Sequence, residues 1–366
     1  MKNIPVTQPY LPSLTELYPY LEEIWHNKWL TNNGPMHQKL EYELCTFLGV
    51  EHISLFNNAT IALIAALKAF DLKGDIITSP YSFIATTQAA EWNNLKPVFV
   101  DIEKDGYNID VAEIEKAIDK NTCAILPVHC YGHPCNVEEI RKLADKYNIK
   151  VIYDAAHAFA SKFNGKSLLE FGDASVVSFH ATKVFNTFEG GAVISKSREI
   201  KEKIDAIKNF GLNKDNDVDL VGLNGKMSEV NAAFGLVQLN HIKSNIERRK
   251  KICELYESYL NKITGISYIQ PSKELESNYS YFPILVENNF RCSRDELFEI
   301  LIKHGIVARK YFNPLISNMS LYKNKNENKR YSLNVANDRS DKVLCLPLYA
   351  DLSNDQVKEI VDIIKG

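Results

Sequence analysis

Residues 151–195 read VIYDAAHAFASKFNGKSLLEFGDASVVSFHATKVFNTFEGGAVIS, and this stretch decides the predicted fold. Three short apolar runs, at 151–154, 175–180 and 191–195, each end in a polar residue. Strands that are buried on both faces of a parallel sheet have such nearly continuous apolar runs. The stretch therefore predicts three neighbouring strands of a mainly parallel sheet.

The same alternation of short strands and longer helical segments extends back to about residue 45, which predicts an α/β fold of βαβ units. Asn136 is a plausible N-cap for one of the helices between the strands. The further strands are expected at 52–56, 75–79, 97–101 and 123–129, and helices are expected at 60–68 and 137–147.

A long charged helix is expected at about 228–259, with a possible break, and a weaker strand and helix pattern follows it. The last helix is expected at 353–365. A chain of 366 residues exceeds the usual length of one compact domain. We therefore expect a large domain at 1–245 and a smaller C-terminal α+β domain at 246–366.

The composition excludes several classes of protein. The sum of Lys and Arg is 43 against 46 for Asp and Glu, a formal charge of -3, and no dense basic block suits a nucleic-acid partner. No apolar run reaches the roughly 20 residues that span a membrane. The N-terminal sequence MKNIPVTQPYLPS lacks the apolar core of a secretory signal, so we expect a cytoplasmic protein.

Seven cysteines are scattered along the chain without a CxxC pair, which favours neither a disulfide framework nor a zinc site. Cys130 and Cys135 bracket the sequence YGHP, and we interpret them as unpaired thiols. No metal is therefore expected.

Asp154 lies at the end of the apolar run VIY, and Lys183 lies just after another buried strand. A carboxylate after VIY is costly unless a cation faces it, and a protonated pyridine nitrogen is one such cation. Lys183 has apolar and small neighbours that would lower its pKa and suit imine formation. Each residue also has an ordinary interpretation, a helix cap for the aspartate and a surface residue for the lysine.

The sequence NNAT at 57–60 lies between a strand and an apolar helix, where free backbone amides favour an anion. A plain Asn or Thr cap explains it equally well. Ser178, just before Lys183, carries a hydroxyl that could reach a phosphate. Neither GxGxxG nor GxxxxGK[ST] occurs, which disfavours a nicotinamide or P-loop nucleotide site.

Several motifs in the right order resemble the DegT/DnrJ/EryC1/StrS family of sugar aminotransferases over essentially the whole chain. They are LTNNGP, NNAT, TSPYSFIAT, PVFVDI, ILPVHCYGHP, VIYDAAHA, FGDASVVSFHATK, FEGGAVIS, GLNGKMSEVNAAFGLVQL, GIVARKYFNPL and LCLPLY. The resemblance implies the fold of type I pyridoxal-phosphate (PLP) enzymes. It also implies an enzyme, an aminotransferase that takes PLP as its cofactor.

Carried over to this chain, the resemblance gives each cofactor residue a role. Lys183 would bond to PLP as a Schiff base, Asp154 would pair with the pyridine nitrogen, and His157 would lie near the phenolic oxygen. Phe83 would stack on the ring. The phosphate would be bound by Ala59, Thr60, Ser178 and, from the neighbouring subunit of a homodimer with a shared active site, Asn224.

The resemblance also implies a substrate class, a nucleotide-linked keto sugar with L-glutamate as amino donor. SFHATK and FEGG are similar to members that aminate carbon 4 of a dTDP-linked 4-keto-6-deoxy sugar for surface polysaccharide or glycoside synthesis. The candidate sugar or nucleotide contacts are Trp29, Asn32, Asn33, His180, Glu189, Arg309, Lys310 and Tyr311.

Alternatives remain open at this point: amination at carbon 3, formation of the galactose epimer, a PLP-dependent sugar dehydratase, or a non-catalytic regulatory member. Lys183 argues against the dehydratase, in which a histidine replaces the lysine. Two residues depart from the family pattern. Ala59 stands where many members have glycine, and Lys226 stands where many have arginine, which removes a bidentate fork.

Overall fold

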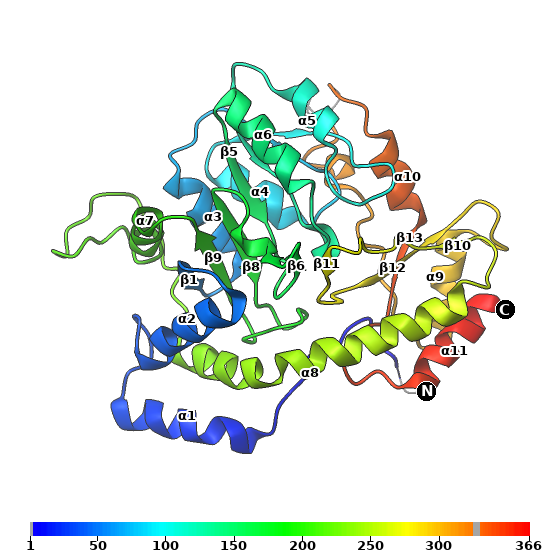
Figure 1. Cartoon of the computed structure of the whole chain (residues 1–366), viewed down its shortest axis with the longest axis horizontal. Coiled ribbons are helices and arrows are strands. Elements are labelled where there is room, and N and C mark those ends of the chain that lie inside the picture. The colour runs from blue at the N-terminus through cyan, green and yellow to red at the C-terminus, as the bar shows by residue number, and fades with distance from the viewer. Residues whose placement is uncertain (1–2, 325–329) are drawn as a thin grey trace.

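The computed structural model describes residues 3–324 and 330–366, and its largest element is a seven-stranded sheet (Figure 1). The strand order is β1-β9-β8-β5-β4-β2-β3. Only β9 runs against its neighbours β1 and β8, whereas the other pairs are parallel. The bounds are β1 Ile53–Phe56, β2 Asp75–Thr78, β3 Lys96–Phe99, β4 Thr122–Leu126, β5 Lys150–Asp154, β8 Ala174–Ser178 and β9 Gly191–Ser195. All seven expected strands and the mainly parallel sheet are confirmed.

Alternation along the strands divides their side chains between two hydrophobic cores. Ile76 and Ile152 pack with α3 residues, whereas Ile77 and Val151 pack on the opposite face with residues of α5 and α6. The sheet is thus covered on both faces, which explains why its strands are mainly apolar. The helices that accompany it are α2 Pro35–Leu48, α3 Ala59–Ala69, α4 Ile84–Trp92, α5 Val111–Ala117, α6 Val137–Tyr147 and α7 Arg198–Lys208.

Side-chain caps fix where several helices begin. The Asn58 side chain accepts a hydrogen bond from the amide of Ile61 at the start of α3, and Asn136 accepts one from Glu139 at the start of α6. Ser228 caps α8 (Glu229–Leu260) in the same way. The helix is continuous over its 32 residues, so the possible break within it is not observed.

The helix α8 connects the sheet to a second hydrophobic core. Its first half packs beside α1 (Leu14–Asn27) and α2, and its second half packs with the C-terminal residues. There a small antiparallel sheet has the order β10-β12-β13. The elements of this part are β10 Ile266–Ser267, β12 Phe282–Val286, β13 Val343–Leu346, α9 Arg294–Lys303, α10 Asn334–Lys342 and α11 Asn354–Lys365. A third sheet joins β11 Leu275–Glu276, β6 Lys162–Phe163 and β7 Lys166–Ser167.

The N-terminal segment packs against the C-terminal core (Figure 1). The amide of Ile4 donates to the carbonyl of Gly305 at 2.8 Å, and Val307 donates back to Ile4 at 2.8 Å. Leu348 likewise donates to Val6 at 2.9 Å. The division at residue 246 stays a prediction, with α8 running through that position. Within the described residues, no helix combines the length and apolar character needed to cross a membrane.

Candidate active site

Asp154 and Lys183 follow two neighbouring strands at one edge of the sheet. Asp154 is the last residue of β5, and Lys183 lies in the loop after β8. These strands pair in parallel, with Asp154 opposite Val176, so both residues lie at the carboxyl edge where open α/β sheets bind ligands. Burial lowers the pKa of Lys183 to about 8, although the charge of Asp154 acts in the opposite direction.

The carboxylate of Asp154 is buried and held by two hydrogen bonds. Thr86 Oγ1 donates to Oδ2 at 2.6 Å, and the amide of Ala156 donates to Oδ1 at 3.1 Å. Burial raises the pKa of this carboxyl, while both hydrogen bonds and the charge of Lys183 lower it. A buried carboxylate is stabilised further by a cation, which is what a protonated pyridine offers.

His157 is buried beside these two residues, and its hydrogen bonds indicate its tautomer. The amide of Tyr131 donates to Nδ1 at 3.0 Å, so a neutral ring carries its proton on Nε2. Burial lowers the pKa of His157 well below its usual value, and the charge of Lys183 lowers it further. The side chain is therefore a neutral hydrogen-bond donor through Nε2.

The N-terminus of α3 lies against the end of β9. A methyl group on Gly191 would lie 2.8 Å from both the Cα and the amide nitrogen of Ala59, so only glycine permits this approach. Gly191 also pairs with Ser178 across the sheet. These contacts bring the start of α3 at Ala59 close to Ser178, with Thr60 next along the helix. We call this group of helix amides and a hydroxyl the cradle, and such a group suits a phosphate.

Asn224 lies next to the same helix start within its own chain. Its carbonyl accepts a hydrogen bond from Asn57 Nδ2 at 3.5 Å, and the neighbouring Gly225 accepts one from the Asn57 amide at 2.8 Å. Its side-chain oxygen accepts a hydrogen bond from Lys226 Nζ at 2.7 Å. A contact from Asn224 to the phosphate of a neighbouring subunit stays a prediction.

Phe83 lies at the N-terminus of α4 with 61% of its surface exposed. Its carbonyl accepts a hydrogen bond from the amide of Thr86, which in turn holds Asp154. The side chain of Phe83 is therefore exposed at the start of α4. Its stacking on the cofactor ring stays a prediction.

Two candidate sugar contacts lie together at the rim. His180 Nε2 and Glu189 Oε1 are 3.6 Å apart, and both side chains are exposed. His180 lies between Ser178 and Lys183 in the loop after β8. A contact from this pair to the sugar stays a prediction.

The other candidates separate into two groups. Asn32 and Asn33 line a cavity of about 260 Å³ together with Lys226, and the indole of Trp29 donates to the carbonyl of Thr31 at 2.5 Å. No described contact connects Trp29, Asn32 or Asn33 with Lys183. Their role stays a prediction.

The second group consists of Arg309, Lys310 and Tyr311, and the three residues have different surroundings. The carbonyl of Tyr311 accepts a 3.1 Å hydrogen bond from the Tyr81 hydroxyl, and the Tyr311 side chain lies near enough to Lys183 to raise the pKa of the lysine. Lys310 pairs with Asp295 at 2.6 Å, so its charge is already engaged. The main chain of Arg309 pairs with Cys345.

Two residues of the site carry roles that sequence reasoning did not assign. Thr86 lies in the run TSPYSFIAT, three residues after Phe83, and helical spacing could have pointed to it. Tyr281, directly before β12, receives a hydrogen bond of 3.4 Å from Lys183 Nζ. It is far from Lys183 in sequence and has no motif around it, so only the folded chain identifies it.

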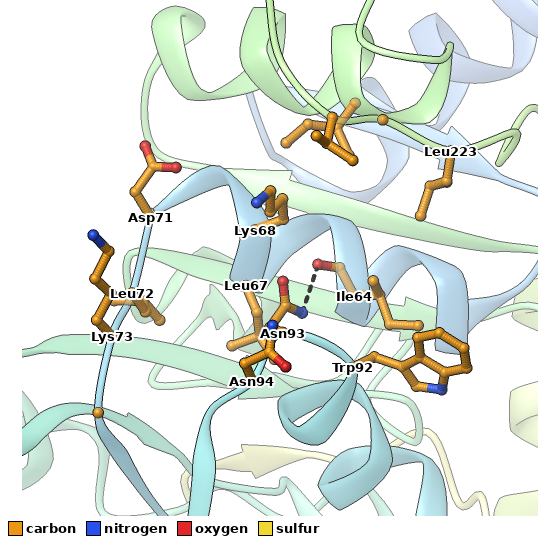
Figure 2. A pocket seen from close by; sticks show the side chains of 14 residues that line it. Ile64, Leu67, Lys68, Asp71, Leu72, Lys73, Trp92, Asn93, Asn94 and Leu223 are labelled. Carbon is orange, nitrogen blue, oxygen red and sulfur yellow. Dashed lines mark hydrogen bonds between the residues drawn. The ribbon is translucent and has the colours of Figure 1, made fainter.

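A cavity of about 550 Å³ lies away from this site (Figure 2). It is lined by the C-terminal ends of α3 and α4, including Lys68, Trp92 and Asn93, whereas Thr60 and Phe83 lie at the opposite ends of these helices. Two of its lining residues are bonded to each other, since Asn93 Nδ2 donates to the carbonyl of Ile64 at 3.1 Å (Figure 2). The cavity is therefore separate from the chemistry at Lys183.

The sequence pattern of the DegT/DnrJ/EryC1/StrS aminotransferase family matches residues 14–365. The chain belongs to this family, and it is a PLP-dependent sugar aminotransferase. Among its relatives, the dTDP-4-amino-4,6-dideoxy-D-glucose transaminases of Escherichia coli and Shigella dysenteriae are each 55% identical to it. The alignments extend over 366 and 364 residues and cover 100% of this chain and 99% of each relative.

A solved structure of DesI, in the presence of its TDP-sugar product, superposes on the chain with a TM-score of 0.95. It is 30% identical, and the match covers 100% of this chain and 93% of DesI. The expected type I aminotransferase fold is therefore confirmed.

Proposed function

We propose that this chain transfers an amino group from L-glutamate to carbon 4 of dTDP-4-keto-6-deoxy-D-glucose, giving dTDP-4-amino-4,6-dideoxy-D-glucose. The observation that carries the proposal is 55% identity, over the full length, to two transaminases named for that product. The adjacent amine and carboxylate of the site support turnover rather than a binding role alone.

The described residues fit PLP. Asp154 would hold a proton on the pyridine nitrogen, and His157 Nε2 would donate to the phenolic oxygen. Phe83 would stack on one face of the ring. The cradle of Ala59, Thr60 and Ser178 would bind the phosphate, with Asn224 of a second subunit beside it.

When bound, PLP supplies a carbonyl that takes up the amino group and a ring that withdraws electrons from the reacting carbon. Between turnovers, the amine of Lys183 would hold the cofactor covalently. Once free, the amine would accept the proton from the alpha carbon of glutamate and would later deliver a proton to carbon 4 of the sugar. A pKa of about 8 keeps a useful fraction of this amine neutral near neutral pH.

The sugar would lie on the open side of this site. His180 and Glu189 are proposed to contact it, with Tyr311 approaching from the C-terminal part. Trp29, Asn32, Asn33, Arg309 and Lys310 complete the proposed contacts to the sugar or the nucleotide.

The proposed assembly is a homodimer with shared active sites. The loop after α7 projects from the body of the chain (Figure 1) and exposes Phe210, Val218 and Val221. Exposed apolar side chains on a projecting loop favour burial against a partner. The loop ends near Asn224, so a second copy that covers it would approach the phosphate cradle. Cytoplasmic location and a role in surface polysaccharide synthesis stay predictions.

The test is to incubate the protein and PLP with L-glutamate and either the 4-keto or the 3-keto isomer of dTDP-6-deoxyhexose. We expect amination of the 4-keto isomer, with the gluco product identified by NMR and no turnover by Lys183→Ala. Exclusive amination of the 3-keto isomer, or the galacto product, would contradict the proposed specificity.

A further inference from the structure

The C-terminal part of the chain contributes one polar atom to the reactive lysine. Lys183 Nζ donates a hydrogen bond of 3.4 Å to Oη of Tyr281. Lys183 follows β8 of the large sheet, whereas Tyr281 directly precedes β12 of the small sheet. The amine therefore has a partner from each part of the chain, Asp154 by charge and Tyr281 by hydrogen bond.

The Tyr281 ring has little freedom to move away from the lysine. Its centroid lies 4.8 Å from that of His157 and 5.4 Å from that of Tyr131. Tyr311 packs against it edge to face at 6.0 Å. Aromatic rings packed from several sides hold one another in a defined orientation.

The backbone before Tyr281 is tied to the same loop that carries His157. Asn278 Nδ2 donates to the carbonyls of His157 and Phe159 at 2.7 and 2.8 Å. Ser280 Oγ also donates to the His157 carbonyl, at 2.8 Å. These hydrogen bonds fix the position of Tyr281 relative to the large sheet.

The phenol of Tyr281 can form a hydrogen bond with Lys183 whether the lysine is protonated or neutral. Burial raises the pKa of Tyr281, so it keeps its O–H. A hydroxyl both accepts and donates. It accepts from the ammonium of Lys183 and can donate to the same nitrogen once the amine is neutral. Within the described part of the chain, the Tyr281 hydroxyl has this one hydrogen bond, with Lys183.

We propose that Tyr281 is a positioning residue that holds Lys183 Nζ in line for proton transfer in both of its protonation states. The inference rests on the proposed function, because it assigns Tyr281 to the proton steps that Lys183 performs there. It concerns the geometry of the amine and not the recognition of the sugar.

The test compares Tyr281→Phe with the wild type and with Tyr107→Phe. Tyr107 belongs to the same aromatic cluster and is buried, but among the residues that the structure describes its hydroxyl has no hydrogen-bond partner and no recorded contact with the lysine. Acetic anhydride labels Lys183 in the cofactor-free protein across a pH series, and peptide mass spectrometry reports the extent. Thermal unfolding checks that each variant is folded.

The hydrogen bond from the charged ammonium is stronger than the bond to the neutral amine, so removing the phenol favours the neutral amine and should move the midpoint of labelling to lower pH in Tyr281→Phe. With PLP restored, the single-turnover reaction with glutamate should slow about 10- to 100-fold, the effect of losing one hydrogen bond to a charged group, whereas the glutamate concentration that gives half the maximal rate should be nearly unchanged. The midpoint should not move in Tyr107→Phe.

A midpoint in Tyr281→Phe equal to that of the wild type, or an equal shift in Tyr107→Phe, would overturn the proposal. The labelling needs neither sugar nor PLP. A wild-type protein that fails to aminate the sugar would therefore refute the proposed function without deciding the role of Tyr281.

Discussion

Thr86 Oγ1 donates a hydrogen bond of 2.6 Å to Oδ2 of Asp154, and this contact connects the start of α4 to the end of β5. Ser82 Oγ lies 2.7 Å from the same threonine hydroxyl. The carboxylate that is proposed to hold the pyridine nitrogen is therefore itself held by a short chain of hydroxyls.

Thr86→Val keeps the shape of this side chain but removes its donor. The Asp154 carboxylate loses a hydrogen bond that orients it and lowers its pKa, so PLP should bind up to about tenfold more weakly. Titration of the cofactor-free protein with PLP measures this. Ser82→Ala, which leaves the bond to Asp154 intact, is the control, and equal affinities in all three proteins would contradict the role of Thr86.

Gly191→Ala should weaken the phosphate cradle. The added methyl would lie 2.8 Å from the backbone of Ala59 and would push the start of α3 away from β9. Weaker PLP binding is expected, together with a loss of stability of about 1–3 kcal/mol from overpacking. Gly106→Ala is the matched control because its methyl would meet the side chain of Glu103, 2.5 Å from Oε2, which can move. Unchanged PLP affinity in Gly191→Ala would count against the cradle.

Glu189→Gln tests the sugar side of the site. Glu189 lies 3.6 Å from His180, and loss of its charge should raise KM for the nucleotide sugar severalfold. The single-turnover reaction with glutamate should not change. Glu202→Gln serves as the control, because Glu202 is also exposed and also pairs with a basic residue, Arg198, at 3.1 Å. A slower glutamate reaction with an unchanged KM for the sugar would move Glu189 to the amino-donor step.

Glu41 should make stability depend on acid pH. Burial raises its pKa, but a hydrogen bond from His37 and the charges of Lys208 and Lys201 outweigh burial and lower the pKa from 4.5 to about 2. The unfolded chain therefore binds more protons between these values, so stability is lost as pH falls from about 4.5 toward 2.

At pH 7, Glu41→Gln should lower the free energy of unfolding by up to about 3 kcal/mol, and this difference should shrink as the pH falls below about 4.5. Denaturant unfolding across a pH series measures both effects. Glu113→Gln breaks an exposed pair with Lys116, which lies 2.6 Å away, and should cost little. A constant cost of Glu41→Gln at every pH would rule out a titrating carboxylate.

Periodicity was sufficient to predict the large sheet because each strand is a short apolar run followed by a polar residue. It also located Asp154 and Lys183, since residues after parallel strands gather at one edge. Periodicity could not predict the contacts of Tyr281, because they join segments about a hundred residues apart by side-chain packing alone. The pairing of Ile4 with Gly305 and Val307 likewise depends on tertiary structure, and no local sequence pattern predicts it.

The uninterrupted α8 has a thermodynamic consequence. Ala233 and Val237 near its start lie in one hydrophobic core, and Ile252 and Tyr256 further along lie in another. If either core unfolds, half of α8 loses its packing contacts, and the other core is destabilised as a result. The two halves of the chain should therefore lose their structure together, as a single calorimetric peak on heating.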